Sequence, residues 1–430
     1  MWRNYIESVP RAAYEESGLR IRRRNSDVVI VCDPDLIHEV LVEKADAFGR
    51  EPVTRRSFAP VIGRTSLFLA EGAEWRWQRR VVAPIFRHDA LLSFVPVFAA
   101  MARRQIERWR ATPRGAVVDA AAAMTRTTFE IIVETMLGGT ASLDAEGFSR
   151  ALTESFETIP WHLVYAMFSV PEWMPYPHQR RALQARDYLH RETRRIVEAR
   201  RQARSERPDL LDLLLAAQDP ETGRRMSDSE VITNLLTFII AGHETTAVAL
   251  TWTLWLLAKD PAAQQRVCDE AATAMVSEAP IAAAQIESLG FCRQVLQEAM
   301  RLFPPAPAIG RQPKAAVKLG DIEIGPRTRV HIPVFALHRN RRLWPEPNTF
   351  DPDRFAPERV KARSRYAFLP FGGGPRVCIG ASFAMLEAAV ILAALTRAFR
   401  FAPVPGHSPK PVARVTLRPA GGMPLLISPR

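Results

Sequence analysis

One long apolar segment constrains the fold of this 430-residue chain more than any other feature. It begins at Ser227-x-x-Glu230, which matches the capping box of a helix N-terminus, and runs without proline to Lys259. Asp260-Pro261 then ends it. The pattern predicts a helix of about 33 residues, roughly 50 Å long at 1.5 Å per residue.

Polar residues interrupt this apolar run at Asn234, at Thr237 and from His243 to Thr246. Charged residues in a lipid-facing span cost several kcal/mol. We therefore expect the helix to cross the interior of a large soluble domain rather than a membrane.

The composition is that of a soluble globular protein, with 47% hydrophobic and 24% charged residues. No Gly/Ser-rich, acidic or low-complexity linker divides the chain. We expect one domain over residues 1–430, with a sheet-rich part at about 1–70, a helical bulk at about 71–400 and a C-terminal β-hairpin at about 412–430.

Cysteine usage and charge narrow the class of protein further. The four cysteines form neither a C-x-x-C pair nor metal-finger spacing, which favours a reducing, cytoplasmic compartment without disulfides. Met1 to Arg24 contains no apolar run of signal-peptide or anchor length, so we expect no transmembrane anchor. The net charge of +12 is spread along the chain without a nucleic-acid motif, which favours an acidic protein partner.

Local patterns place further elements along the chain. The β-branched run Val28 to Val31 predicts a strand, and Asp33-Pro34 supplies the cap and first-turn proline of a helix. Residues 91–204 have mostly helical spacing. Residues 415–418 and 425–428 flank a Pro- and Gly-rich segment, which predicts two strands around a turn.

The segment from Phe371 to Gly380 presents a single thiol, Cys378, after the glycines at 372–374. Helical apolar spacing follows from Ile379, so Cys378 is expected at or near a helix N-terminus. Free N–H groups and the helix dipole there favour the thiolate, and a thiolate can hold haem iron. The alternative is a buried structural cysteine after a glycine turn.

The pattern F-x-x-G-x-R-x-C-x-G in this segment resembles the haem-binding signature of the cytochrome P-450 superfamily. The resemblance implies that Cys378 is the axial ligand of a haem iron and that Arg376 pairs with a haem propionate. It also places Phe371 in the haem-binding segment.

The long helix contains the sequence Ala241-Gly242-His243-Glu244-Thr245-Thr246. Its small residues leave room beside the backbone, and Thr245 can bond back to the carbonyl of Ala241, which loosens a helix locally. The sequence resembles the oxygen-binding motif of the same family, which implies that Glu244 and Thr245 help deliver protons and that Ala241 and Gly242 lie beside the haem. Alternatively, Thr245 merely satisfies itself on the backbone and Glu244 pairs with an arginine.

Some family members attach haem covalently through a glutamate just before the glycine of this motif. The present chain has Ala241 at that position. The resemblance therefore implies haem b, held noncovalently apart from the bond between iron and sulfur.

Two further arginine motifs complete the resemblance. Glu298-x-x-Arg301 and the Arg354 of Pro352-Asp353-Arg354-Phe355 resemble elements that form a structural triad beside the haem. The alternative is two unrelated surface pairs, each worth under about 1 kcal/mol.

Trp75 and Arg79 stand four residues apart and resemble the family's propionate-binding W-x-x-x-R helix, and Arg311 matches another propionate position. An indole N–H and an arginine fork suit a carboxylate. The alternative is ordinary core packing for Trp75 and a solvated charge for Arg79.

These motifs occur in the family's order, and the resemblance covers nearly the whole chain. It implies a mainly α fold with small β-sheets, a triangular helical domain in which the long helix lies over haem. It also implies a monomeric monooxygenase that inserts one oxygen atom from O2 into an organic substrate. Rival functions are a noncatalytic haem-thiolate sensor and a peroxide-driven enzyme of the same fold.

Substrate and electron donor are expected from composition and position. The segment from Ile159 to Tyr176 carries many apolar side chains where the family has its access lid, so a mainly apolar substrate is expected. No part of the chain resembles a flavin domain or a ferredoxin, which implies a separate ferredoxin or flavodoxin-type donor with its reductase. We expect that donor to be acidic and to dock on a basic surface on the sulfur side of the haem, made of Arg76, Arg80, Arg87, Arg363 and Arg365.

Overall fold

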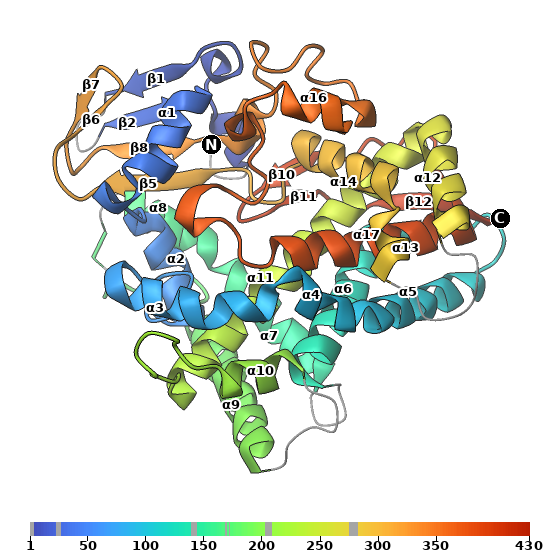
Figure 1. Cartoon of the computed structure of the whole chain (residues 1–430), viewed down its shortest axis with the longest axis horizontal. Coiled ribbons are helices and arrows are strands. Elements are labelled where there is room, and N and C mark those ends of the chain that lie inside the picture. Colours follow the sequence, from blue (N-terminus) through green and yellow to red (C-terminus); the bar gives the residue numbers. More distant parts are fainter. Residues whose placement is uncertain are drawn as a thin grey trace.

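The computed structural model describes residues 4–22, 27–138, 144–167, 170–171, 173–202, 209–274 and 283–430. Helices form a broad, roughly triangular body, and the largest sheet lies at one corner of it (Figure 1). This is the mainly α architecture with small sheets that the sequence predicts.

The long helix α11 (Asp228–Lys259) passes through the middle of this body (Figure 1). The Ser227 hydroxyl accepts a hydrogen bond from the Glu230 N–H at 3.3 Å, and the Glu230 carboxylate accepts one from the Ser227 N–H at 2.8 Å. The predicted capping box and helix are confirmed. Most residues of α11 are buried, because other helices surround it.

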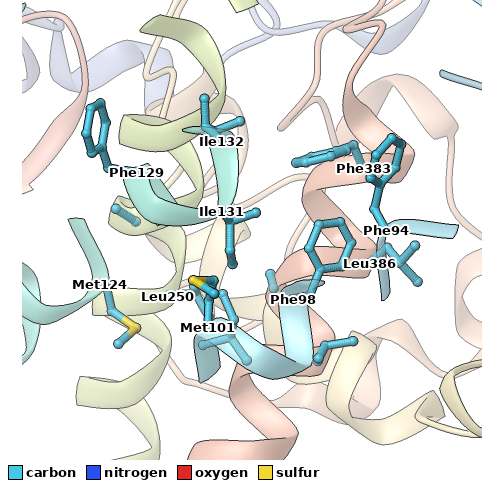
Figure 2. Packing of buried hydrophobic residues seen from close by; sticks show 14 of the residues in the cluster. Phe94, Phe98, Met101, Met124, Phe129, Ile131, Ile132, Leu250, Phe383 and Leu386 are labelled. Carbon is cyan, nitrogen blue, oxygen red and sulfur yellow. The ribbon is translucent and has the colours of Figure 1, made fainter. Parts of the chain in front are cut away.

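The helices that build the core around α11 are α5 (Val95–Arg110), α6 (Ala120–Leu137), α9 (Gln179–Gln202), α14 (Gly290–Leu302) and α17 (Ala381–Ala398). Figure 2 shows apolar side chains of α5, α6, α11 and α17 packed together. Between α5 and α17 the rings of Phe98 and Phe383 meet edge to face, with centroids 5.1 Å apart. Such aromatic contacts add to the stabilisation from burial alone.

Shorter helices complete the body. They are α1 (Pro34–His38), α2 (Pro52–Ile62), α3 (Gly72–Val82), α4 (His88–Leu91), α7 (Ala145–Glu157), α8 (Ile159–Met167), α10 (Leu210–Ala216), α12 (Pro261–Ala274), α13 (Ala283–Glu287), α15 (Val334–Leu337) and α16 (Pro357–Lys361). The predicted helical character of residues 91–204 is therefore confirmed for the described part of that range, apart from the short strand β4 (Val117–Asp119).

The largest sheet joins two distant parts of the chain. Its strand order is β1 (Gly18–Ile21), β2 (Val28–Val31), β8 (Arg329–Ile332), β5 (Ile309–Pro313) and β3 (Phe48–Gly49), with β2 and β8 parallel. The strand predicted at 28–31 is confirmed. The N-terminal sheet is not built from residues 1–70 alone, however, because β5 and β8 supply its other strands.

The expected C-terminal hairpin is wrong in its pairing. Strand β11 (Leu417–Pro419) pairs back with β10 (Pro411–Ala413), and β12 (Pro424–Pro429) instead lies between β4 and β9 (Phe399–Pro403). Gly421 and Gly422, with φ of 77° and 89°, turn the chain between the two sheets. Leu425 and Ile427 of β12 are buried in the main core, which fixes the strand there. A separate pair is formed by β6 (Val317–Leu319) and β7 (Ile322–Ile324).

Among the described residues, two helices are long and apolar enough to cross a membrane, α11 and α17, and the bent pair 72–86 and 88–110 passes the same test as a single span. In the structure 78% of the most apolar window of α11 and 61% of that of α17 are buried inside the protein. The apolar surface of α11 is therefore largely covered by protein, as the polar interruptions of its sequence predict.

Replacing Ser227 by alanine should lower the free energy of unfolding by about 1 kcal/mol, because one reciprocal cap is lost at the N-terminus of α11. Chemical denaturation would measure the change. Ser229→Ala is the matched control, since Ser229 is exposed in the same first turn. Equal losses in the two variants would contradict a special role for the cap.

Candidate haem site

The loop before α17 presents the Cys378 side chain. The Cys378 N–H donates to the carbonyl of Phe371 at 2.9 Å, and the Val377 N–H donates to the carbonyl of Gly374 at 3.0 Å. These two bonds close the loop on itself around a short 3-10 turn at Gly374–Arg376. The backbone, rather than side-chain contacts, therefore sets the position of the thiol.

Gly374 fits where no other residue could. Its φ is 69°, and a Cβ built on it would lie 1.9 Å from the carbonyl oxygen of Leu41. A side chain would thus be both strained and in collision with the backbone. The glycine motif serves the close packing of the cysteine loop against the N-terminal segment that contains Leu41.

The electrostatics of Cys378 differ from the sequence-based expectation. Its side chain is exposed, yet enclosing protein atoms desolvate the thiol and raise its pKa above the ordinary value, while the Gly380 N–H and the Arg79 charge lower it. Desolvation therefore opposes the ionisation expected at a helix start, while the Gly380 N–H and Arg79 favour it. Cys378 lies before the N-cap residue Gly380, outside the first turn of α17, where the helix dipole is weaker.

A cluster of arginines lies near this loop together with the carboxylates of Glu51 and Glu71, and some of its buried N–H groups have no hydrogen-bond partner among the described residues. Within the described part of the chain, Arg376 donates from Nη2 to the carbonyl of Ala70 at 2.9 Å, while its buried Nη1 has no partner. Burial, and then the Arg376 charge, lower the pKa of Arg311 to about 10. The same kind of environment lowers the pKa of Arg50, whose buried Nε also has no partner.

Unpaired buried cations call for anionic ligands. A haem carries two carboxylates, so this donor set, together with the single thiol, fits the group. Arg50 is a member of the cluster that the sequence motifs missed, because the family resemblance covers Arg79, Arg311 and Arg376 but not Arg50. Its position directly after β3, beside Glu71, becomes apparent only in the fold.

Trp75 and Arg79 take different places in this cluster. The Trp75 ring stacks under the guanidinium of Arg376, whose central carbon lies 4.5 Å from the ring centroid. Arg79 interacts electrostatically with Cys378, and burial lowers its pKa. Trp75 thus orients Arg376, and Arg79 is one of the cations close enough to influence the thiol.

The predicted ion pairs of Glu298 form. Arg301 donates to both carboxylate oxygens of Glu298, at 2.6 and 2.7 Å, and both side chains are completely buried. The Nε of Arg354 lies 3.5 Å from the same carboxylate. These are buried pairs and not the surface pairs of the alternative interpretation.

The middle of α11 has one open stripe. Phe238, Ala241 and Thr245 are partly or fully exposed at helical spacing, whereas most of their neighbours in the helix are buried. The Thr245 hydroxyl donates to the Ala241 carbonyl at 2.7 Å, as the sequence predicts. This stripe leaves space beside the helix for a ligand.

Gly242 is partly exposed, and its place beside the haem stays a prediction, but the glycine also has a packing role. A Cβ on Gly242 would lie 2.7 Å from Cδ1 of Ile132 in α6. The absent side chain therefore allows α6 and α11 to pack closely. Sequence alone cannot tell this use of a glycine from contact with a ligand.

Glu244 is buried, and its partners come from the hairpin that β10 and β11 form. The Thr416 hydroxyl and the Arg418 guanidinium both bond to it, with Arg418 Nε at 2.8 Å. Both contacts of the alternative interpretation are thus present. Thr245 donates to the backbone of its own helix, and an arginine pairs with Glu244.

A cavity of about 690 Å³ lies on the outer side of the cysteine loop. Loop residues form one wall and the side chains of α14 and α17 the others. Residues of its lining include His88, Arg293, Gln297, Phe371, Ala381 and Met385. A partner bound there would lie directly against the segment that carries Cys378.

The five arginines of the expected basic surface already have contacts within the chain. Arg76 pairs with Asp46, Arg80 with Asp219 and Arg87 with Asp89, while Arg363 stacks over Trp344 and Arg365 over Tyr366. Three of the five charges are thus paired with acids, and the basic docking surface stays a prediction. The acidic partners of Arg76, Arg80 and Arg87 come from other segments or the next turn, which a count of arginines does not reveal.

The apolar segment from Ile159 to Tyr176 is partly described. Trp173 is 79% exposed, and Trp161 and Met174 are each 37% exposed. The side chains of Leu163 and Met167, and Phe168 as a whole, lie outside the described residues. The described part keeps large apolar side chains at the surface.

His338 supports the base of the cysteine loop. Its Nε2 accepts the Leu369 N–H at 2.8 Å, and burial, followed by the charges of Arg301 and Arg339, lowers its pKa to about 3. The folded protein therefore resists protonation of this ring.

The free energy of unfolding should fall as pH decreases from about 6.5, the usual pKa of histidine. Below that pH the unfolded chain binds a proton at residue 338, whereas the folded protein keeps His338 neutral. The slope is about 1.4 kcal/mol per pH unit for each such histidine until the folded pKa is reached. His338→Gln keeps an acceptor for Leu369 and should show a shallower decline in denaturation experiments between pH 6.5 and 4.5. His88→Gln, at an exposed histidine, is the control. Parallel curves for His338→Gln and the unsubstituted protein would refute the assignment.

Comparison with known proteins agrees with this geometry. The sequence profile of the cytochrome P450 family matches residues 12–425. Cyclooctatin synthase of Streptomyces melanosporofaciens is 32% identical over 405 residues, which cover 94% of this chain and 86% of that protein. Cyclooctat-9-en-7-ol 5-monooxygenase of the same organism is 29% identical, over 94% of this chain and 87% of that protein. Cytokinin hydroxylase of Arabidopsis thaliana is 32% identical, over 92% and 78%.

Solved structures match over the same extent. The haem domain of cytochrome P450DA superposes with a TM-score of 0.84 at 26% identity and covers 96% of this chain and 90% of that one. The cytochrome P450 CYP102L1 superposes with a TM-score of 0.85 at 26% identity, over 100% and 95%. The chain therefore belongs to the cytochrome P450 family, whose members are haem b monooxygenases.

Proposed function

We propose that the protein inserts one oxygen atom of O2 into a mainly apolar organic substrate, with Cys378 as the axial ligand of the haem iron. The observation that supports this role best is the single thiol of Cys378, presented by a rigid loop beside a cluster of cations. Haem bound through a thiolate supplies the activation of dioxygen.

The residues around the thiol have separate roles in this proposal. Arg311 and Arg376 hold the propionates, with Trp75 fixing the plane of Arg376 and Arg50 adding a further charge. Arg79, which interacts with Cys378, helps to hold the sulfur as an anion. Glu298, Arg301 and Arg354 keep the surrounding segments in place and take no part in the reaction.

Ala241 and Thr245 face the reacting side in this proposal. The Thr245 hydroxyl donates its hydrogen to Ala241, which leaves its oxygen lone pairs free to accept a proton or a hydrogen bond. Glu244, one residue earlier, is the acid that resupplies protons to this position. The open stripe on α11 supports the assignment, because it is where a ligand can reach the helix.

The substrate is proposed to be mainly apolar, since the exposed side chains around α8 are large and uncharged. Among the relatives, one is named for oxidising cyclooctat-9-en-7-ol and another for oxidising a cytokinin. Identity over nearly the whole chain supports a small organic substrate for this protein also.

Electrons are proposed to come from a separate ferredoxin or flavodoxin-type donor with its reductase. The cavity on the outer side of the cysteine loop is the docking position that the geometry favours, because Phe371 lines it and accepts the hydrogen bond of the Cys378 N–H. The single-domain organisation, the monomeric state and the cytoplasmic location stay predictions from the sequence.

Cys378→Ala should abolish the red-shifted Soret band that thiolate ligation gives to the reduced carbon monoxide complex, because the thiolate sulfur is removed. Difference spectroscopy would measure it. Cys268→Ala is the matched control, since that cysteine lies partly exposed in α12. A band that survives Cys378→Ala would show that another residue binds the iron.

Thr245→Ala should keep the fold and the haem content while the fraction of electrons that reaches product falls by about tenfold, because proton delivery is disturbed and iron ligation is not. Product and hydrogen peroxide would be quantified per NAD(P)H consumed. Thr253→Ala is the control, because its hydroxyl makes the same backbone bond, to Ala249 at 2.7 Å, two turns away. Equal coupling in both variants would contradict the role of Thr245, and full product yield with peroxide alone would favour the peroxide-driven alternative.

A further inference from the structure

Strand β11 is fastened to α11 at two places. The Trp252 Nε1 donates to the Leu417 carbonyl at 2.7 Å, and the residues on either side of Leu417, Thr416 and Arg418, both bond to Glu244. Leu417 is also held from its other side, since its N–H donates to the Pro305 carbonyl at 3.1 Å. The strand is therefore a fixed support for the Glu244 side chain.

Within the described part of the chain, the hydrogen bonds to the Glu244 carboxylate all go to one oxygen. Oε1 accepts from the Thr416 hydroxyl and from Arg418 Nε at 2.8 Å, and Arg418 Nη2 lies 2.5 Å from it. No described residue donates to Oε2. A carboxylate oxygen that accepts several hydrogen bonds cannot also carry a proton without losing them. Only Oε2 is thus available to hold a transferable hydrogen.

We call Thr416 and Arg418, bonded to Glu244, the clamp. It joins a buried acid to the protein surface. The Glu244 side chain is 8% exposed, whereas that of Arg418 is 55% exposed. His243, the other titratable group beside Glu244 in α11, is directed elsewhere, because its Nδ1 lies 2.8 Å from the Ile239 carbonyl. Arg418 is therefore the only described cation that pairs directly with this carboxylate.

We propose that Arg418 and Thr416 are positioning residues that hold Glu244 by Oε1 and leave Oε2 as its proton-carrying oxygen. The inference rests on the proposed role of Glu244 in supplying protons. A side chain with three rotatable bonds would otherwise sample several positions, and small misplacements of a proton donor cost large factors in rate.

The test compares Arg418→Leu and Arg418→Lys with Arg414→Leu in the haem-loaded protein. Arg414 is exposed in the turn of the same hairpin, so its replacement removes the same charge without touching Glu244. Arg418→Leu should lower the fraction of electrons coupled to product by about tenfold. Arg418→Lys, which keeps a charged donor, should recover part of it, and Arg414→Leu should not change it.

A second measurement does not depend on turnover. Hydrogen exchange of the backbone amides at 241–246 should become faster in Arg418→Leu than in Arg414→Leu, because the clamp braces the middle of α11. Unchanged exchange together with unchanged coupling in Arg418→Leu would overturn the proposal.

Glu244→Gln separates this inference from the proposed function. If Glu244→Gln leaves coupling unchanged, the proton-supplying role of Glu244 is wrong. The positioning role of Arg418 and Thr416 is then wrong as well. If Glu244→Gln lowers coupling while Arg418→Leu does not, only the positioning role is wrong. Adding Arg418→Leu to Glu244→Gln should cause no further loss, since both act through the same carboxylate.

Discussion

The buried ion pair of Glu298 and Arg301 holds in place the segment that leads to the cysteine loop. Arg301 donates both to Glu298 and to the carbonyls of His338, Pro347 and Thr349, so that α14 is fixed to the chain from 338 to 349. His338 in turn accepts the Leu369 N–H at the base of the loop. Removing one member of such a buried pair leaves an uncompensated charge, at a cost of about 3–5 kcal/mol. The position of the thiol thus depends on an ion pair that never touches it.

A second support reaches the same loop from the N-terminal sheet. Gly374 lies against the Leu41 carbonyl, while Arg311 of β5 and Arg376 of the loop repel each other across the site. The charges of Glu51 and Glu71 offset part of this repulsion. An anion bound among these arginines would offset more of it.

Local signals in the sequence predict local structure well, and long-range partners poorly. The capping box at Ser227, the strand at 28–31 and the ion pair at i and i+3 in α14 all depend on neighbours within a few residues, and all three form. By contrast, the pairing of β12 with β9, the approach of Arg50 to the site and the bond from Arg418 to Glu244 join residues far apart in the chain. No periodicity or composition specifies such partners, because they follow from how the elements pack.

The N-terminal residue Asn4 contacts the hairpin that β10 and β11 form near the C-terminus. The Asn4 side chain donates to the Pro411 carbonyl at 2.9 Å and accepts the Ala413 N–H at 2.9 Å, so an N-terminal residue holds β10 in place. Strand β10 pairs with β11, which contains Arg418 and directly follows Thr416. Residues far apart in the chain thus converge on Glu244 of α11. Since a hairpin of two short strands is marginally stable alone, Asn4 and Trp252 are what make it rigid enough to hold a buried acid.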